Sequence, residues 1–193
     1  MNILIQNIRR LSLVLFLIIC AKGVIGQNGY RDSIKVEMSV LEKPNDYLIN
    51  TINNESNPKR LSILYNLLGL NYQRENAFEA AMQSHQRALN YAFLIGVPNE
   101  EIAISYNKIG IVYYFQANCD SAIVNFEKAL PYYETQRLKA NTYTNIGLMN
   151  NQKLNRDLAI ENYLKALEIF KAVGDTINQG NLYNNIGALY NQI

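Results

Sequence analysis

The residues of this sequence that could carry out chemistry are few and do not form a cluster. The chain has one histidine, His85, and no group of Cys, His or carboxylate residues accompanies it as a metal site or a general base would require. We therefore expect His85 to be a core histidine, with a ligand or base as the alternative. Glu100 and Glu101 are adjacent, and neighbouring side chains on a helix point about 100° apart, so they are not a catalytic carboxylate pair.

Cys119 is the second candidate for reactivity. No basic residue neighbours it in the sequence to stabilise a thiolate, so we expect a small, partly buried apolar residue rather than a reactive thiol. The sequence also contains no Gly-rich phosphate loop and no G-x-S-x-G nucleophile elbow. These observations predict a protein that is not an enzyme and has no catalytic, cofactor-binding or metal-binding residues.

The elements that position these residues follow from a phrase that recurs four times. The phrase is an aromatic residue, two spacers, Leu or Ile, Gly, two spacers, and Tyr or Asn. Its four copies are Tyr65-x2-Leu68-Gly69-x2-Tyr72, Tyr106-x2-Ile109-Gly110-x2-Tyr113, Tyr143-x2-Ile146-Gly147-x2-Asn150 and Tyr183-x2-Ile186-Gly187-x2-Tyr190. Offsets of 3, 4 and 7 place these positions on one stripe of an α-helix. A glycine inside a helix costs roughly 1 kcal/mol relative to alanine, which predicts that a second helix lies too close for a Cβ.

A second pattern follows each of the first three copies. An alanine comes twelve positions after the glycine, a ring-bearing residue comes four later, and another alanine comes three after that. The three sets are Ala81, His85 and Ala88; Ala122, Phe126 and Ala129; and Ala159, Tyr163 and Ala166. Small residues at this spacing predict a second helix that crosses the first closely.

Together the two patterns resemble the tetratricopeptide repeat, over about residues 57–193. The departures are Tyr in place of the family's Trp, Asn150 for the last Tyr, and His85 for the aromatic residue. The resemblance implies an all-α fold, a right-handed α-solenoid of antiparallel helix pairs with three full repeats and a half repeat.

Successive glycines are 41, 37 and 40 residues apart, whereas the ordinary unit has about 34. These long units resemble the extended repeats of kinesin-light-chain-like and bacterial sensor proteins, and the extra length predicts a longer second helix or a longer following first helix.

The chain divides into three parts on these signals. Residues 1–26 have two arginines, a short apolar run and small residues at their end, which is typical of a secretory signal peptide; an uncleaved membrane anchor is the alternative. Residues 27–57 form an N-terminal segment with a short capping helix at 46–53. Residues 58–193 form the repeat domain, with units at about 58–97, 98–135, 136–174 and a partial 175–193. Within the repeat domain, helices are expected at 58–74 and 77–95. Asn99 and Asp175 are expected to cap the helices that follow them. Pro131 is expected to kink or shorten the second helix of the second unit.

The signal peptide and the charge balance bear on location and partners. We expect an exported protein on the periplasmic or extracellular side, with membrane association as a further option. Cleavage after residue 26 would remove three of the 18 basic residues and leave 15 basic against 16 acidic ones. Such a balance gives no electrostatic basis for binding nucleic acid.

In the tetratricopeptide family the first helix of each pair lines a concave groove that holds an extended peptide. Carried onto this sequence, the groove positions are uncharged and rich in amides, which can both donate to and accept from a peptide backbone. The candidate groove residues are Asn66, Gln73, Asn107, Tyr114, Asn141, Asn145, Asn151, Asn181, Asn184 and Asn185. The alternative is that these asparagines cap local backbone or face water.

The resemblance implies a scaffold that binds a protein or peptide partner. An alternative is the N-terminal, extracytoplasmic sensory part of a longer bacterial membrane histidine kinase or transcriptional regulator, with a membrane span beyond residue 193. A third expectation concerns the last helix, in which Leu182, Tyr183, Ile186, Leu189 and Tyr190 would leave an apolar face uncovered. Such a face predicts either a continuing chain or a homodimer formed through the C-terminal helix.

Overall fold

The computed structural model describes residues 43–191 of the chain. The predicted signal peptide, the first part of the N-terminal segment and residues 192–193 lie outside the described residues. Between residues 43 and 191 the chain forms eight α-helices and one 3-10 helix, and no strand. They are α3 (Asn45–Asn53), α4 (Pro58–Arg74), α5 (Phe78–Ile95), α6 (Glu100–Phe115), α7 (Cys119–Ala129), the 3-10 helix η1 (Leu130–Tyr132), α8 (Gln136–Gln152), α9 (Arg156–Ala172) and α10 (Thr176–Tyr190).

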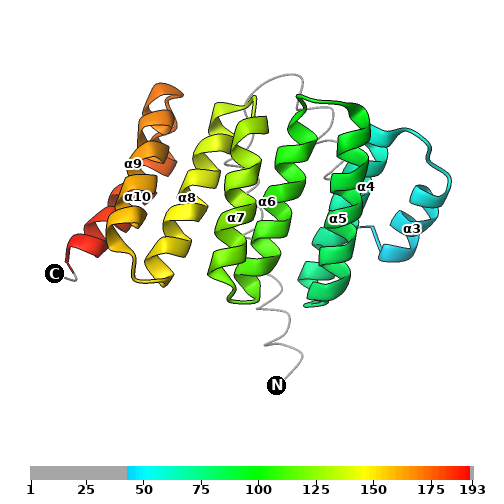
Figure 1. Ribbon diagram of the computed structural model, residues 1–193, viewed down its shortest axis with the longest axis horizontal. Coiled ribbons are helices and arrows are strands. Elements are labelled where there is room, and N and C mark those ends of the chain that lie inside the picture. The colour runs from blue at the N-terminus through cyan, green and yellow to red at the C-terminus, as the bar shows by residue number, and fades with distance from the viewer. Residues whose placement is uncertain (1–42, 192–193) are drawn as a thin grey trace. The chain divides into compact units, whose positions relative to one another are not determined.

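Each helix packs against the helix before it in the chain (Figure 1). We call α4, α6, α8 and α10 the A helices, because each carries one copy of the glycine phrase, and α5, α7 and α9 the B helices. The described residues therefore form an all-α helical-repeat solenoid, as predicted. None of the described helices has both the length and the apolar content needed to cross a bilayer.

The helix ends follow from local side-chain chemistry. The side-chain oxygens of Asn57, Asn99, Asn118 and Asp175 each accept a hydrogen bond from the backbone N–H three residues later. Such caps satisfy N–H groups that have no partner inside the helix. The predicted caps at Asn99 and Asp175 are confirmed, and α4 has the predicted bounds. Pro131 lies in the 3-10 helix that ends α7, which confirms the predicted shortening.

The variable repeat length lies mainly in the B helices. The 41- and 40-residue intervals contain α5 with 18 residues and α9 with 17, whereas the 37-residue interval contains α7 with 11. The A helices vary only between 15 and 17 residues. Of the two predicted sources of extra length, the longer second helix is therefore the main one.

The turn from each A helix to its B helix has one conformation in all three units. Asn76, Ala117 and Leu154 have φ values of 60°, 56° and 63°, in the left-handed region. The backbone N–H of the next residue donates to the carbonyl oxygen of the last phrase position in each case, at 2.8, 2.9 and 2.9 Å. This bond closes the A helix and starts the B helix at the same point of every unit, although alanine and leucine seldom adopt a left-handed φ.

The first three glycines of the phrase lie under the rings of the B helices. A Cβ added to Gly69 would stand 2.5 Å from the His85 ring, and one on Gly110 would stand 2.6 Å from the Phe126 ring. Gly147 has the same relationship with a third ring. The sequence therefore predicted the close approach correctly, and the group that causes it is the ring between the two alanines of the second pattern.

The last helix differs from the sequence-based expectation. Leu182 and Leu189 are buried, 1% and 2% exposed, in a cluster that includes residues of α9. Only part of the predicted apolar face is therefore uncovered, and its large exposed members are Tyr183 and Tyr190, at 53% and 57%. The expectation of a wholly uncovered apolar face was wrong, because α9 covers two of its leucines.

Candidate protein-interaction surface

Two of the predicted groove residues bind neighbouring A helices instead of facing solvent. Asn66 on α4 is 5% exposed, and its amide N–H donates to the hydroxyl of Ser105 on α6 at 3.0 Å. The amide of Asn107 on α6 donates to the hydroxyl of Thr142 on α8 at 3.1 Å. The same type of bond thus joins α4 to α6 and α6 to α8. Buried in this way, the Asn66 amide is not accessible to a peptide.

His85 also engages these amides. Its Nδ1 lies 3.0 Å from the Asn66 side-chain oxygen, and its Nε2 lies 3.2 Å from the Gln73 side-chain oxygen. Burial, assisted by the positive charge of Lys108, lowers the pKa of His85 to about 3, so the ring is neutral at physiological pH. His85 is therefore a core residue, as its isolation in the sequence predicted.

A neutral imidazole has one donor and cannot donate to two oxygens. The amide nitrogen of Gln73 is buried without a partner in this arrangement. Flipping the Gln73 amide, so that its nitrogen and oxygen exchange places, lets its NH2 donate to Nε2 while Nδ1–H donates to Asn66. This orientation gives both ring nitrogens of His85 a suitable partner and assigns the Nδ1–H tautomer to His85, and the Gln73 oxygen then takes the buried position that has no partner. The side chain of Gln73 is therefore bound to His85 inside the first unit.

Six other predicted groove residues have side-chain amides with no partner in the part of the chain that the structure describes. Among the described residues, no side-chain hydrogen-bond partner is found for Asn141, Asn145 and Asn151 on α8 or for Asn181, Asn184 and Asn185 on α10. The three on α8 are partly exposed and the three on α10 are exposed. Asn141 and Asn145 are four residues apart on one face, and Asn181 and Asn185 repeat that spacing one repeat later. The A helices at the C-terminal end therefore carry an array of available amides.

The corresponding faces of the first two A helices are more apolar. Ile63 and Leu70 on α4 and Ile104 and Ile111 on α6 are partly exposed. Tyr114, the remaining predicted groove residue, is partly buried against the cluster that contains Phe126, with its ring 5.2 Å from that of Phe115. The A helices therefore differ along the chain: α4 and α6 carry an apolar set (Ile63, Leu70, Ile104 and Ile111) where α8 and α10 carry the six amides.

Polar contacts hold the starts of successive A helices together. The Glu100 carboxylate, at the start of α6, accepts bonds from the backbone N–H of Thr135 at 2.9 Å and from its hydroxyl at 3.2 Å. Arg137, at the start of α8, lies 3.3 Å from the carboxylate of Asp175, which caps α10. Sequence analysis missed these contacts because their partners are 35 and 38 residues apart in the chain. They fix the spacing of the surface on which the amides stand.

Each unit also has a cation over the first tyrosine of its phrase. Arg87 lies 5.7 Å from the Tyr65 ring centroid, and Lys128 and Lys165 lie 5.8 Å from those of Tyr106 and Tyr143. In every case the cation is two residues after the ring that covers the glycine, a signal present in the sequence but not used above. In the fourth phrase, Lys171 of the preceding helix lies 5.6 Å from the Tyr183 ring.

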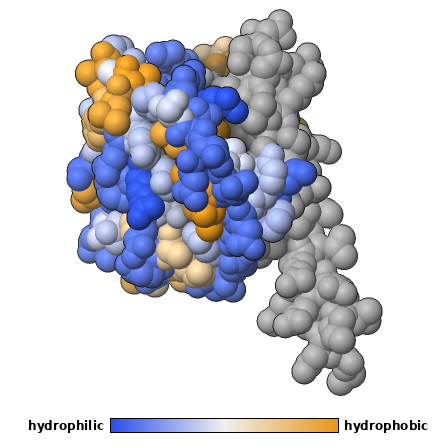
Figure 2. Space-filling model, turned by 90° about the vertical axis from the view of Figure 1, so that its right-hand side faces the viewer, coloured by the Kyte–Doolittle hydropathy of each residue, from blue (hydrophilic) through white to orange (hydrophobic). Residues whose placement is uncertain are grey.

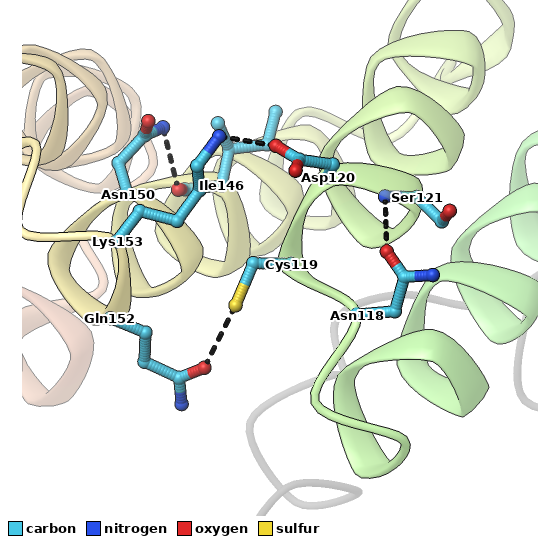
Figure 3. A network of polar contacts seen from close by, with 8 residues as sticks. All are labelled: Asn118, Cys119, Asp120, Ser121, Ile146, Asn150, Gln152 and Lys153. Carbon is cyan, nitrogen blue, oxygen red and sulfur yellow. Dashed lines mark hydrogen bonds and ion pairs between the residues drawn. The ribbon is translucent and has the colours of Figure 1, made fainter.

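Cys119 takes part in the junction between α7 and α8 (Figure 3). Its thiol donates to the side-chain oxygen of Gln152 at 3.3 Å, and the neighbouring Asp120 pairs with Lys153. It is partly exposed, in agreement with the expectation from the sequence. Over the described range, no group of three or more His, Cys, Asp or Glu residues is placed to hold a metal ion.

Hydrophobic residues also gather at the upper edge of the face shown in Figure 2. At the end of α5 and in the loop after it, Phe93, Leu94, Ile95 and Val97 are all exposed. Gly96, within this loop, follows α5 with a φ of 98° and a ψ of 168°, a conformation that glycine adopts far more readily than other residues. The loop between α5 and α6 therefore has an apolar surface.

Comparisons with known proteins agree with this architecture. Residues 59–135 match the model of the tetratricopeptide repeat family. No curated protein sequence matches the chain significantly. Among solved structures, the N-terminal domain of stress-induced protein-1 from C. elegans is 17% identical with a TM-score of 0.58, covering 70% of this chain and 99% of that one.

Two further structures are similar. MamA is 24% identical with a TM-score of 0.56, covering 68% of this chain and 69% of that one. BtubC (BKLC) from P. vanneervenii is 18% identical with a TM-score of 0.54, covering 72% of this chain and 66% of that one. At these identities the likeness concerns the fold. Over residues 59–135 the chain is therefore similar to the tetratricopeptide repeat family, and its fold is similar to that of these three solved structures.

Proposed function

We propose that this chain is an exported scaffold whose A helices bind an extended peptide segment of a partner protein. The coarse part of this function, a protein–protein interaction scaffold, is what the tetratricopeptide fold suggests. The observation that supports the finer part is the set of six unpaired amides on α8 and α10. Amides on a protein surface gain most from a ligand that offers both donors and acceptors, and an extended peptide backbone offers both at every residue.

The apolar set on α4 and α6 supports the same ligand. Ile63, Leu70, Ile104 and Ile111 offer partly exposed apolar side chains on the faces where α8 and α10 carry amides. A peptide lying along these faces would bury its side chains against α4 and α6, and its backbone would form hydrogen bonds with the amides of α8 and α10. None of the ten predicted groove residues is charged, so binding should depend only weakly on salt concentration.

The proposal of export rests on residues 1–26, which lie outside the described residues. Two arginines followed by a short apolar run favour secretion. Expression of the full chain in a bacterium, followed by fractionation and N-terminal sequencing, tests it. Loss of the first residues together with recovery outside the cytoplasm would support export, and an intact cytoplasmic chain would contradict it.

The test of peptide binding begins with a displayed library of random short peptides selected on the full chain. The selected peptide is then measured against a variant with Asn145→Ala and Asn185→Ala, which removes one amide from each of α8 and α10. We expect weaker binding by about fivefold to thirtyfold, the effect of losing two hydrogen bonds worth about 0.5–1 kcal/mol each. Helical content should not change, because both side chains lack partners within the described residues.

The matched control is Asn90→Ala, which removes an exposed amide from the B helix α5. This variant should bind the selected peptide as the unmodified chain does. Equal binding by the Asn145 and Asn185 double variant would place the peptide on another surface and reject the proposal.

A further inference from the structure

Buried polar side chains are concentrated in the first pair of helices, α4 and α5. Of the nine buried polar or charged residues in the described part of the chain, five lie on these two helices: Ser62, Asn66, Asn71, Ser84 and His85. The buried side-chain atoms that lack a hydrogen-bond partner in the described range belong to Asn45, Ser62 and Gln73, on α3 and α4. A buried polar group without a partner destabilises the folded state, so this cost falls on the first pair and on α3.

The ring that covers the first phrase glycine is also the one that can take up a proton in mild acid. His85 lies over Gly69 in the place that Phe126 and Tyr163 take in the next two units, and all three rings are buried. Phenylalanine does not titrate, and burial raises the pKa of Tyr163 above its ordinary value of 10. Of the three crossings, only the one between α4 and α5 therefore contains a ring whose charge changes in mild acid.

The surroundings of His85 suit a neutral ring. On α4 the ring meets Asn66, Gly69 and Gln73, which are uncharged, and the residues four before and three after it on α5 are buried alanines. Burial is the larger cause that lowers the pKa of His85 to about 3, and the positive charge of Lys108 on α6 adds to it.

A proton on the second ring nitrogen would have an acceptor but no opposite charge. With the Gln73 amide turned back, its oxygen lies 3.2 Å from Nε2, so an imidazolium could donate to Asn66 and Gln73 together. The charged side chains nearest in sequence to these groups, Arg74 and Arg87, are cations like Lys108. Hydrogen bonds to neutral oxygens offset only part of the cost of burying an uncompensated charge. The protonated ring is therefore more stable in water than in this contact.

We propose that the contact between α4 and α5 is an acid-sensitive switch, which a proton on His85 opens while α6 to α9 stay folded. Helices of 17 and 18 residues are only marginally stable alone in water, so opening of the contact exposes their backbone N–H groups to exchange. In helical repeats each unit contacts mainly its neighbours, so one unit can open while the others stay closed.

The switch would regulate the proposed peptide surface. Ile63 and Leu70 lie on α4, so opening removes half of the apolar set. This consequence rests on the proposed function, whereas the opening itself does not. The experiment that tests the switch uses the full chain without a peptide, so its result is independent of the peptide proposal.

Amide hydrogen exchange of the full chain, resolved by segment with mass spectrometry at about pH 7 and about pH 5, tests the switch. Protection factors correct for the pH dependence of the exchange chemistry itself. In α4 and α5 they should fall by about twentyfold to thirtyfold, as expected for a histidine with a pKa of 6.5 when exposed and about 3 in the contact. In α8 and α9, where Tyr163 takes the place of the histidine, they should stay nearly constant. This comparison is made within one chain and needs no variant.

The choice of pH 5 limits the contribution of carboxylates. Glu55, in the loop before α4, keeps its charge there, because hydrogen bonds from the backbone N–H groups of Asn57 and Ser56 lower its pKa below the ordinary value of 4.5. The loop that precedes α4 is therefore unchanged in charge while His85 becomes able to take up its proton.

Two variants assign the effect to the ring. His85→Phe removes the titrating group and keeps a ring of the kind that Phe126 places over Gly110, so protection of α4 and α5 should no longer fall between the two pH values. Ser105→Ala is the matched control, because it removes the hydroxyl that Asn66 binds and leaves the titrating ring in place. It should lower the protection of α4 and α5 by a similar factor at both pH values, so that their ratio stays at about twentyfold to thirtyfold.

Three results would overturn the proposal. The first is constant protection of α4 and α5 between the two pH values. The second is an equal fall in α4, α5, α8 and α9, which would mean that acid unfolds the chain as a whole. The third is an equal fall in the unmodified chain and in His85→Phe, which would assign the pH dependence to other groups.

Discussion

The ring of Tyr163 lies over Gly147 so closely that a Cβ on this glycine would stand 2.6 Å from two ring atoms and 3.1 Å from the carbonyl oxygen of Ala159. Ala159 is itself fully buried at the crossing of α8 and α9. The glycine, the ring and the alanine therefore set the distance between the two helices. A change at any of them should alter stability through packing alone.

Replacing Gly147 by alanine should destabilise the chain although alanine favours helices. The new Cβ requires the Tyr163 ring and the Ala159 backbone to move, at a cost of about 1–3 kcal/mol. Improved helix propensity offsets up to about 1 kcal/mol of this cost. Chemical denaturation followed by circular dichroism measures the net change in the free energy of unfolding.

The matched control is Gly187→Ala, where the same change meets open space. This variant should gain up to about 1 kcal/mol from helix propensity. If both variants changed stability equally, the packing explanation of the glycine phrase would be wrong.

Acid should destabilise the chain through His85. Burial sets its pKa to about 3 in the folded chain, below the ordinary value of 6.5. Between these values the unfolded chain binds a proton that the folded chain does not, so the free energy of unfolding falls as the pH is lowered from about 6.5, by at most about 1.4 kcal/mol per pH unit. Above pH 6.5 this contribution does not vary.

His85→Phe isolates the effect, because Phe126 occupies the same position over Gly110 in the next unit. Carboxylates titrate over part of the same range, so the quantity to compare is the difference in unfolding free energy between the two chains at each pH. This difference should shift in favour of the variant as the pH falls from about 6.5. A difference that stays constant down to about pH 4 would contradict a neutral, buried His85.

The bond between Asn107 and Thr142 should couple α6 to α8 energetically. Removing both partners separately and together, as Asn107→Ala and Thr142→Val, forms a double-mutant cycle. We expect a coupling energy of about 0.5–1.5 kcal/mol in the free energy of unfolding. The control pairs Asn107→Ala with Thr144→Val, because the Thr144 hydroxyl donates only within its own helix, to Ala140. If the effects of the substitutions were additive in both cycles, the hydrogen bond between Asn107 and Thr142 would contribute no coupling energy.

Leu154→Gly should stabilise the turn between α8 and α9. Leu154 has a φ of 63° and is 79% exposed, so its side chain contributes little packing. Glycine relieves strain of about 1–2 kcal/mol and loses part of that gain to the entropy of the unfolded chain, which leaves a net gain of roughly 0.5–1 kcal/mol. Leu154→Ala keeps the Cβ and the strain, and should leave the melting temperature nearly unchanged. A stabilising effect of the alanine variant would assign the gain to the lost leucine side chain instead.

The candidate site could be predicted from the sequence only in part. The helical period placed both Asn66 and Asn184 one residue after the first tyrosine of their phrases, yet Asn66 is buried against Ser105 and His85 whereas Asn184 is exposed and has no side-chain partner among the described residues. The sequence period carries no information on this difference. It depends on whether the next A helix brings a hydroxyl to the right place, as α6 does with Ser105.

The sequence by itself determined the helix pairs, their caps and the close crossing at each phrase glycine that a B helix covers. These features depend on neighbours within one turn of helix or on spacings that repeat in every unit, so local chemistry and periodicity specify them. Only the tertiary structure decided that α9 buries Leu182 and Leu189, and that Gly187 alone among the four phrase glycines lies open in the described residues. Such differences arise from contacts between helices whose partners are far apart in the chain. The spacing of those partners varies with the length of each B helix, so no single sequence period predicts them.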